Sequence, residues 1–356
     1  MPPSTETSQR YPADELQRFA QAAIAATGTG PEQAAVVARH LVEGNLAGLE
    51  SHGVMRLRQY YDGVQAGRID PTALPSVESE TGGTAVVDAN GGWGALAGYL
   101  AVELAERKAR AVGVAAISVK NAAHIGRNGS YVLHLAQQGL VAQIFCGLVA
   151  APFVVPWGGR EARFGTNPIA IAIPGSGEPV VMDIATSATA EGKVQVYRNA
   201  GREMPEGLII DAEGNPSTDP NDVYRGGGIL PFGGINGHKG YSLAVMADLL
   251  GGALSGSHVG VRVGEFRNHF LLTAIDPEAL GGSDGMRASV DEYAEWLKSS
   301  ALQPGFDEVL MPGEPEARNT EERLRDGVPL DPSTLELLDA LADDIGIDRL
   351  SGAAPS

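Results

Sequence analysis

The chain has 356 residues, which exceeds the length of one typical core, so we expect more than one packed lobe. Of these residues, 43% are hydrophobic and 20% charged, which is typical of a soluble globular protein. Its net charge of −18 at pH 7 excludes nucleic acid and anionic membrane surfaces as expected partners, because both would repel it. Residues 1–10 are polar, no apolar stretch reaches the length of a membrane span, and Cys146 is the only cysteine, so we expect a cytoplasmic protein without disulfides.

The spacing of apolar residues predicts a helical N-terminal part, followed by alternating strands and helices. Pro31 stands at a first-turn position, which favours a helix start there. The helix predicted at 239–254 is apolar nearly all round, so we expect it to be buried. The predicted strands are 84–88, 114–119, 140–146, 169–173, 180–183 and 270–275, and the predicted helices are 14–26, 31–46, 51–64, 94–111, 128–138, 239–254, 286–299 and 333–342.

This order of elements predicts an α/β fold with a mixed central sheet flanked by helices. A helical lobe from the N- and C-terminal segments accompanies the sheet. We expect residues 1–80 to form an N-terminal helical part that packs with residues 255–356. Residues 81–254 would then form the α/β core that binds cofactor and substrate.

A glycine-rich turn precedes the predicted helix at 239–254. Residues 233–241 are GGINGHKGY, so Lys239 lies among glycines at a helix start. Unpaired backbone N–H groups and the positive end of the helix dipole gather at such a point, which makes it a binding site for anions. The alternative is an ordinary turn with a solvated lysine.

Residues 92–97 (GWGALA) match the glycine pattern of Rossmann dinucleotide-binding folds, between a predicted strand and a predicted helix. The glycines come late, however, after residues 88–91. The next strand ends at residues 119–121 (VKN), without an acidic residue to hold a ribose. We therefore interpret this segment as a turn whose small residues allow close packing of helix and strand.

Two short segments carry candidate catalytic side chains. His52 and Arg56 are four residues apart, on one face if the segment is helical. A histidine can exchange a proton with a substrate hydroxyl near neutral pH, and an arginine can bind a carboxylate through two parallel hydrogen bonds. His124 follows a strand, where α/β folds collect ligands. The alternatives are a helix surface capped by Ser51 and a histidine that only caps the next helix.

Polar residues also lie just outside the strands near 169–173 and 180–183. The segments 165–168 (GTNP) and 183–187 (DIATS), with Gly192 and Lys193, supply hydroxyl and amide groups that can bind phosphate and ribose oxygens. Asp183 can orient an imidazole. Ordinary turns have the same composition. The remaining histidines lack the spacing of metal ligands, so no metal site is predicted.

These segments, in this order, resemble the type 2 malate/L-lactate dehydrogenase family, which includes ureidoglycolate, sulfolactate, diketogulonate and piperideine-2-carboxylate oxidoreductases. The resemblance covers nearly the whole chain. It implies binding of NAD or NADP without a Rossmann domain, a small carboxylate substrate, and a homodimer with its sites near the subunit interface. The matching stretches are 51–53 (SHG) with Arg56 and Leu57, 123–126 (AHIG), 156–159 (PWGG), 165–168 (GTNP), 183–187 (DIATS) with Gly192 and Lys193, and 238–241 (HKGY).

The resemblance also implies roles for individual residues. His52 or His124 would exchange the proton, with Asp183 in the catalytic group. Arg56 would hold the substrate carboxylate, with Ser51 beside it. The residues implied in cofactor binding are Thr166, Asn167, Asp183, Ala185, Thr186, Ser187, Lys193, His238, Lys239, Pro312, Gly313 and Glu314.

One segment departs from the family pattern. Where many members have Asn-Ser or Thr-Asn after the strand ending near Cys146, this chain has residues 147–150 (GLVA), which indicates a more apolar substrate end or contacts by backbone alone. We predict an NAD(P)-dependent oxidoreductase that moves a hydride between nicotinamide and C2 of a 2-hydroxy or 2-oxo acid of the malate or lactate type. The alternatives are a reductase of cyclic imino acids and a non-catalytic anion-binding protein.

Overall fold

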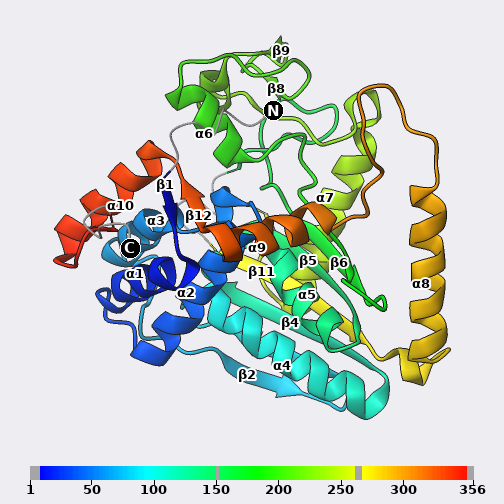
Figure 1. Cartoon of the computed structure of the whole chain (residues 1–356). Helices are drawn as coiled ribbons and strands as arrows, with labels where there is room; N and C mark the ends of the chain where they lie inside the picture. Colours follow the sequence, from blue (N-terminus) through cyan, green and yellow to red (C-terminus); the bar gives the residue numbers. More distant parts are fainter. Residues whose placement is uncertain (1–8, 150–151, 261–266, 351–356) are drawn as a thin grey trace.

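The computed structural model describes residues 9–149, 152–260 and 267–350, and its centre is a seven-stranded sheet (Figure 1). The strand order is β2-β3-β4-β11-β5-β6-β7. β3 and β4 are parallel and the other neighbours are antiparallel, which confirms the predicted mixed sheet. The strands are β2 (Ser76–Glu80), β3 (Thr84–Asp88), β4 (Val114–Ala122), β5 (Val141–Val149), β6 (Ile169–Ile173), β7 (Val180–Ile184) and β11 (Arg267–Ile275).

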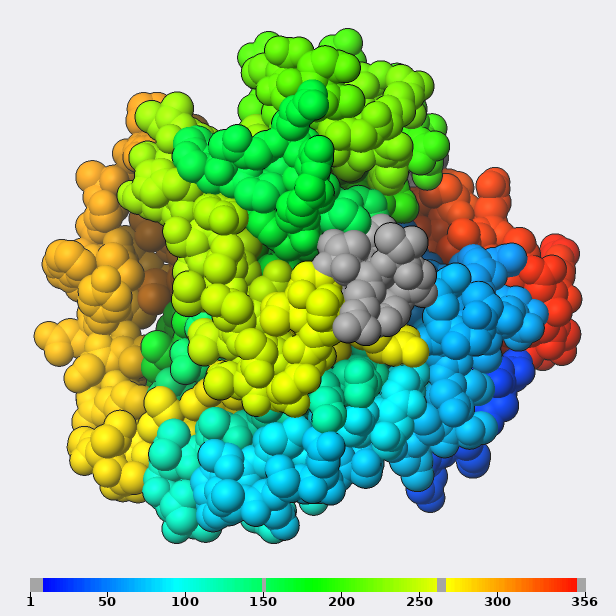
Figure 2. Space-filling view, turned by 180° about the vertical axis from the view of Figure 1, so that it is seen from behind, coloured from blue at the N-terminus to red at the C-terminus, as the bar shows by residue number. Residues whose placement is uncertain are grey.

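Helices cover both faces of this sheet. α4 (Gly94–Val112) and α5 (Asn128–Gln137) pack on one face, where their alanine and leucine side chains form the main core with alternate residues of β4, β5 and β11. α7 (His238–Gly251) lies on the other face. The expectation that this helix is buried all round was wrong, because its buried residues are only the small ones and Asp248, which face the sheet. Its larger side chains Leu243, Met246 and Leu249 are 37–47% exposed. Figure 2 shows the face of the molecule on which α7 lies.

The N- and C-terminal segments form a second, helical lobe with its own core. Two short strands, which the sequence patterns did not indicate, join its ends: β1 (Gln9–Tyr11) pairs antiparallel with β12 (Val328–Leu330). β11 also comes from the C-terminal segment, yet it lies in the middle of the main sheet. The helices of this lobe are α1 (Ala13–Ala25), α2 (Pro31–Leu46), η1 (Glu50–His52), α3 (Arg56–Gln65), α9 (Glu314–Asp326) and α10 (Pro332–Ile345).

A third, small cluster forms the top of the molecule in Figure 1 and packs around Val154, Val194 and Ile209. It contains α6 (Glu191–Asn199), a helix absent from the predicted elements. α8 (Ser283–Lys298) stands apart at the edge and has no buried residue. The remaining elements are β8 (Ile209–Ile210), β9 (Pro216–Ser217), β10 (Gly228–Ile229), η2 (Pro220–Tyr224), η3 (Gly234–Asn236), η4 (Ala253–Ser255) and η5 (Pro277–Ala279).

Among the helices of the described ranges, none is both long enough and apolar enough to cross a membrane. Residues 1–8 and Ala150, which entered the sequence predictions, lie outside the described residues.

Candidate active site

A cleft of about 690 Å³ lies between the helical lobe, the sheet and α6. One wall comes from η1, α3 and α10, and the other from the ends of β4 and β5 and the loop before β6. The predicted residues that line it are Ser51, His52, Arg56, His124, Thr166 and Asn167. Side chains that were predicted from separate segments of the sequence therefore meet in one cavity.

Two imidazole rings, those of His52 and His124, stack in this cleft with centroids 5.8 Å apart. Each ring has a hydroxyl neighbour at its Nδ1 atom. Ser51 Oγ is 3.1 Å from His52 Nδ1, and Tyr60 Oη is 3.0 Å from His124 Nδ1. These contacts at Nδ1 orient both rings toward the cleft.

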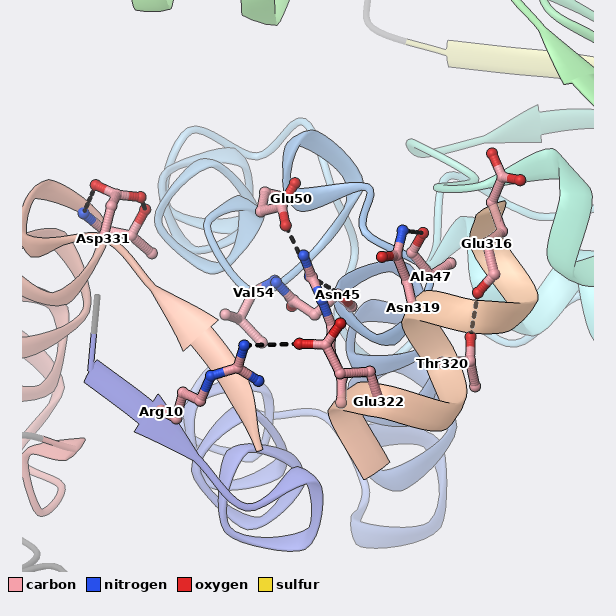
Figure 3. Close-up of polar contacts among 12 residues, drawn as sticks. Arg10, Asn45, Ala47, Glu50, Val54, Glu316, Asn319, Thr320, Glu322 and Asp331 are labelled. Carbon is pink, nitrogen blue, oxygen red and sulfur yellow. Dashed lines mark hydrogen bonds and ion pairs between the residues drawn. The ribbon is translucent and has the colours of Figure 1, made fainter. Parts of the chain in front are cut away.

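The backbone around His52 is fixed by close packing. Asn45 Oδ1 accepts a hydrogen bond of 2.8 Å from the Val54 backbone N–H, and a Cβ at Gly53 would come within 2.3 Å of the same oxygen. α9 holds this segment from outside, since Asn319 donates to the Ala47 carbonyl (Figure 3). These contacts explain why the predicted helix at 51–64 is interrupted, with η1 ending at His52 and α3 beginning only at Arg56.

His124 is placed by the start of α4. A Cβ at Gly94 would lie 2.5 Å from the backbone oxygens of both Ala123 and His124, so only glycine fits there. This confirms the interpretation of residues 92–97 as a turn that allows close packing. The glycine motif therefore positions a candidate catalytic residue.

Arg56 presents a fixed guanidinium to the cleft. Its Nε donates to the Ser51 carbonyl at 2.5 Å and its Nη1 donates to Gln59 Oε1 at 2.6 Å. Its Nη2 points toward Gly192 of α6, across the cleft. Because both bonds hold the planar group, it is preorganised for an anion such as a carboxylate.

Burial and nearby cations change the proton affinity of both imidazoles. Burial, followed by the charges of Arg56 and Arg127, lowers the pKa of His52 to about 4. Burial, followed by Arg56, lowers the pKa of His124 well below its usual value. Both rings are therefore neutral at pH 7, which corrects the expectation of a histidine that titrates near neutral pH.

Asp183 lies away from the imidazole that it was expected to orient. Its Oδ2 accepts a 2.7 Å hydrogen bond from the Gly129 backbone at the start of α5 and lies 4.0 Å from Arg127 Nε. Burial raises the pKa of Asp183, with Arg127 opposing. The positions that orient His52 and His124 are instead held by Ser51 and Tyr60, because Asp183 projects from β7 toward α5.

Several residues implied in cofactor binding form a continuous strip from the cleft to the start of α7. Thr186 Oγ1 donates to the carbonyls of Thr166 and Asn167 at 3.0 and 3.1 Å. A Cβ added at Gly240 would lie 3.0 Å from the Thr186 carbonyl oxygen, so the start of α7 packs closely on this segment. Lys239, next to Gly240, is exposed. Ala185 precedes this contact, and Ser187 follows it with a bond to the Thr189 carbonyl.

The other implied residues lie outside the cleft lining. Lys193 is exposed on α6, and the His238 ring lies 6.1 Å from that of Trp157. The Pro312 carbonyl accepts from Val181 of β7, with Gly313 adjoining, and Glu314 pairs with Lys298. In the described part of the chain, no group of three or more His, Cys, Asp and Glu side chains could hold a metal ion.

The cleft also contains residues that the sequence patterns did not indicate as functional. Tyr60 is buried behind the cleft lining, and its contact with His124 indicates a role in the site. Asn128 and Asn268 line the cleft, and both are at least nine-tenths buried. Among the described residues, the Asn128 amide oxygen and nitrogen and the Asn167 amide oxygen have no hydrogen-bond partner.

Comparison with known proteins places this geometry in context. The family model described as malate/L-lactate dehydrogenase matches residues 11–339. A malate dehydrogenase of Pyrococcus abyssi is 36% identical, with 97% of each chain covered. A Δ1-pyrroline-2-carboxylate/Δ1-piperideine-2-carboxylate reductase of Pseudomonas putida is also 36% identical, over 95% of this chain and 98% of that protein. The structure of malate dehydrogenase from Pyrococcus horikoshii superimposes with a TM-score of 0.88 at 32% identity, over 97% of this chain and 98% of that one.

Proposed function

Because the chain belongs to the malate/L-lactate dehydrogenase family and is a hydroxy acid dehydrogenase, we propose that this cleft is its active site. The reaction moves a hydride between a nicotinamide cofactor and C2 of a small 2-hydroxy or 2-oxo acid. One observation carries the proposal: the stacked rings of His52 and His124 share a cavity with Arg56. Proton exchange at C2–OH and anchoring of the adjacent carboxylate require these two kinds of group.

Arg56 binds the substrate carboxylate in this proposal, with Ser51 beside it. The guanidinium is already oriented by Ser51 and Gln59, so little rotational freedom is lost when the acid binds. The carboxylate then fixes C2 near the imidazoles. Burial, followed by the charges of this arginine and Arg127, lowers the pKa of His52.

His52 exchanges the proton of the substrate hydroxyl, and His124 polarises the C2 oxygen. Tyr60 Oη can donate to Nδ1 of His124, which leaves an N–H at Nε2 as the donor to a carbonyl oxygen. Neutral His52 is ready to accept a proton at pH 7, because its pKa is about 4. Asp183 supports the start of α5 in this scheme, beside the cofactor.

The nicotinamide cofactor, when bound, supplies or accepts the hydride. Asn128 and Asn167 fit its carboxamide, because their buried amide atoms without partners offer matching donors and acceptors. Thr166, Thr186 and Ser187 continue toward the start of α7, where Lys239 and His238 would bind a phosphate of the cofactor. Ala185, Lys193 and the 312–314 turn complete the proposed cofactor surface. NAD and NADP are both compatible with these residues.

Reduction of cyclic imino acids is a second candidate function, favoured by the similarity to the Pseudomonas putida reductase. Such a substrate keeps the carboxylate for Arg56, and its protonated imine needs less assistance from an acid. A non-catalytic anion-binding protein would use the same arginine and helix start, but it would consume no cofactor.

A homodimer fits the exposed apolar surface. Ile235 is 92% exposed beside α7, which itself exposes Leu243, Met246 and Leu249. A surface of this kind is typical of a subunit interface. We also propose a cytoplasmic location, since the single cysteine is buried and free.

The test is to mix the protein with NADH or NADPH and a panel of 2-oxo acids and cyclic imines, and to follow the nicotinamide absorbance. Steady oxidation with 2-oxo acids, and much less with the neutral amide of the same compound, is expected. Oxidation with imines alone would favour the second candidate function. No turnover with any compound, combined with binding of the acids, would support the anion-binding alternative.

A further inference from the structure

The end of β5 presents alternate residues to opposite sides of the sheet. Cys146 and Leu148 line the cleft, and Gly147 between them faces α7. Leu148 therefore lies in the cleft wall opposite the helical lobe that carries Arg56. Its side chain contacts the loop before β6, since a Cβ at Gly165 would lie 2.8 Å from Leu148 Cδ2.

The orientation of Leu148 is fixed by Gly147. A Cβ at Gly147 would lie 2.1 Å from His269 Nε2 and 2.3 Å from Asp248 Oδ1. These two groups form a buried pair 3.5 Å apart between β11 and α7. No larger residue fits at position 147, and a register shift would place Leu148 against this pair. Leucine is therefore held at the cleft surface, where a polar residue would supply a hydrogen bond to a substrate.

The other arginines that line the cleft do not compensate for the apolar wall by binding a second carboxylate of the substrate. Arg56 is assigned to the first carboxylate. Arg58 is neutralised by Asp62 at 3.1 Å and by Asp344 at 2.6 Å. Arg68 is exposed at the rim, where water screens its charge.

We propose that Leu148 makes this enzyme select monocarboxylic substrates whose remainder is hydrocarbon, and reject dicarboxylates. The substrates are 2-oxo acids with an aliphatic chain at C3, or cyclic 2-imino acids. A second carboxylate against Leu148 would lose water without gaining a partner, whereas methylene groups gain contact there. This inference rests on the proposed function and identifies the substrate class of the same site.

The experiment compares kcat/KM for 4-methyl-2-oxopentanoate, Δ1-piperideine-2-carboxylate and oxaloacetate in the unmodified protein and in Leu148→Asn, Leu148→Met and Leu324→Asn. Asparagine has nearly the shape of leucine, methionine keeps the wall apolar, and Leu324 is exposed on α9. The unmodified protein should prefer a hydrocarbon substrate over oxaloacetate by ~10-fold or more. Leu148→Asn should reduce this preference by ~10-fold, and the other two variants should keep it.

A preference of the unmodified protein for oxaloacetate would overturn the inference and leave the proposed function intact. An unchanged preference in a folded Leu148→Asn variant would overturn it as well. Failure to oxidise NADH or NADPH with any of the three compounds, or with other 2-oxo acids, would instead remove the proposed function, and this inference with it.

Discussion

The two walls of the cleft differ in chemistry. The helical wall supplies Ser51, His52 and Arg56, which lie within six residues of sequence, and Tyr60 contacts His124 from behind the lining. The sheet wall supplies Cys146 and Leu148 from β5, with buried amides at its edge. A short segment thus carries most of the proposed proton and carboxylate chemistry, and the sheet determines what else fits. Reactivity and specificity can therefore be changed separately.

The largest expected effect comes from removing the imidazole of the helical wall. His52→Ala should lower kcat by ~10²–10⁴-fold, the usual contribution of general acid–base catalysis. In the unmodified protein, kcat/KM for 2-hydroxy acid oxidation should rise through pH ~4 as His52 loses its proton, and the variant should lack this rise. His124→Ala should lower kcat/KM but keep the rise. The reverse outcome, a rise lost with His124 and kept without His52, would exchange the two roles.

Acid should destabilise the folded protein through His40, which lies on α2 behind the cleft. This ring is fully buried on α2 beneath the loop that carries His124, and burial lowers its pKa to about 3. The unfolded chain, with a usual pKa near 6.5, therefore binds more protons between pH 6.5 and 3. The free energy of unfolding should fall by ~1.4 kcal/mol per pH unit on acidification across that range from His40 alone.

Urea unfolding at pH 6.5 and pH 4.5 measures this effect in the unmodified protein and in His40→Gln. The variant should lose less stability than the unmodified protein, by ~2.3 kcal/mol, because the unfolded histidine is only half protonated at pH 6.5. Equal losses would mean that His40 does not need to stay neutral in the fold.

Arg56→Lys tests whether the helical wall needs a planar guanidinium, because the variant keeps the positive charge and removes the planar group. The lysine cannot make two parallel bonds to a carboxylate, so kcat/KM for a 2-oxo acid should fall by ~10-fold or more. Steady-state kinetics with the acid and its amide provide the measurement. An unmodified protein that is equally active on both would show that no carboxylate clamp exists.

The smallest expected effect lies beyond both walls, at Lys239. An exposed lysine that meets a cofactor phosphate contributes roughly 1 kcal/mol, so Lys239→Ala should raise the cofactor KM about fivefold and leave kcat nearly unchanged. Arg18→Ala, which removes an exposed cation from α1, is the control. An unchanged cofactor KM in Lys239→Ala would favour the alternative that Lys239 is a solvated lysine in an ordinary turn and binds no phosphate.

The helical wall was partly predictable from the sequence, because the site residues lie close together along the chain. His52 and Arg56 already had the spacing of neighbours, and the position of His124 after a predicted strand indicated it as a candidate. Tyr60 was not predicted, since its spacing in the apolar stripe matched that of a core residue. The contact of its hydroxyl with His124 depends on the packing of α3 beside the loop after β4, which the sequence pattern does not give.

Contacts between distant segments were less predictable. Asp183 was expected to orient an imidazole, yet β7 directs it toward Gly129. The exposed side of α7 carries leucine and methionine residues, which are also typical of a buried helix. Its composition therefore could not indicate that this side is exposed. In both cases the arrangement of the sheet decides which neighbour a side chain meets.

The measurement that tests the central claim most directly follows an isotope from cofactor to substrate. The protein is given a 2-oxo acid with a reduced nicotinamide cofactor that carries deuterium at the transferable C4 position, in ordinary water, and the product is analysed by mass spectrometry. Direct hydride transfer predicts one deuterium at C2 of the 2-hydroxy acid, at a lower rate but the same position with His52→Ala. A product whose C2 hydrogen comes from water would contradict the account.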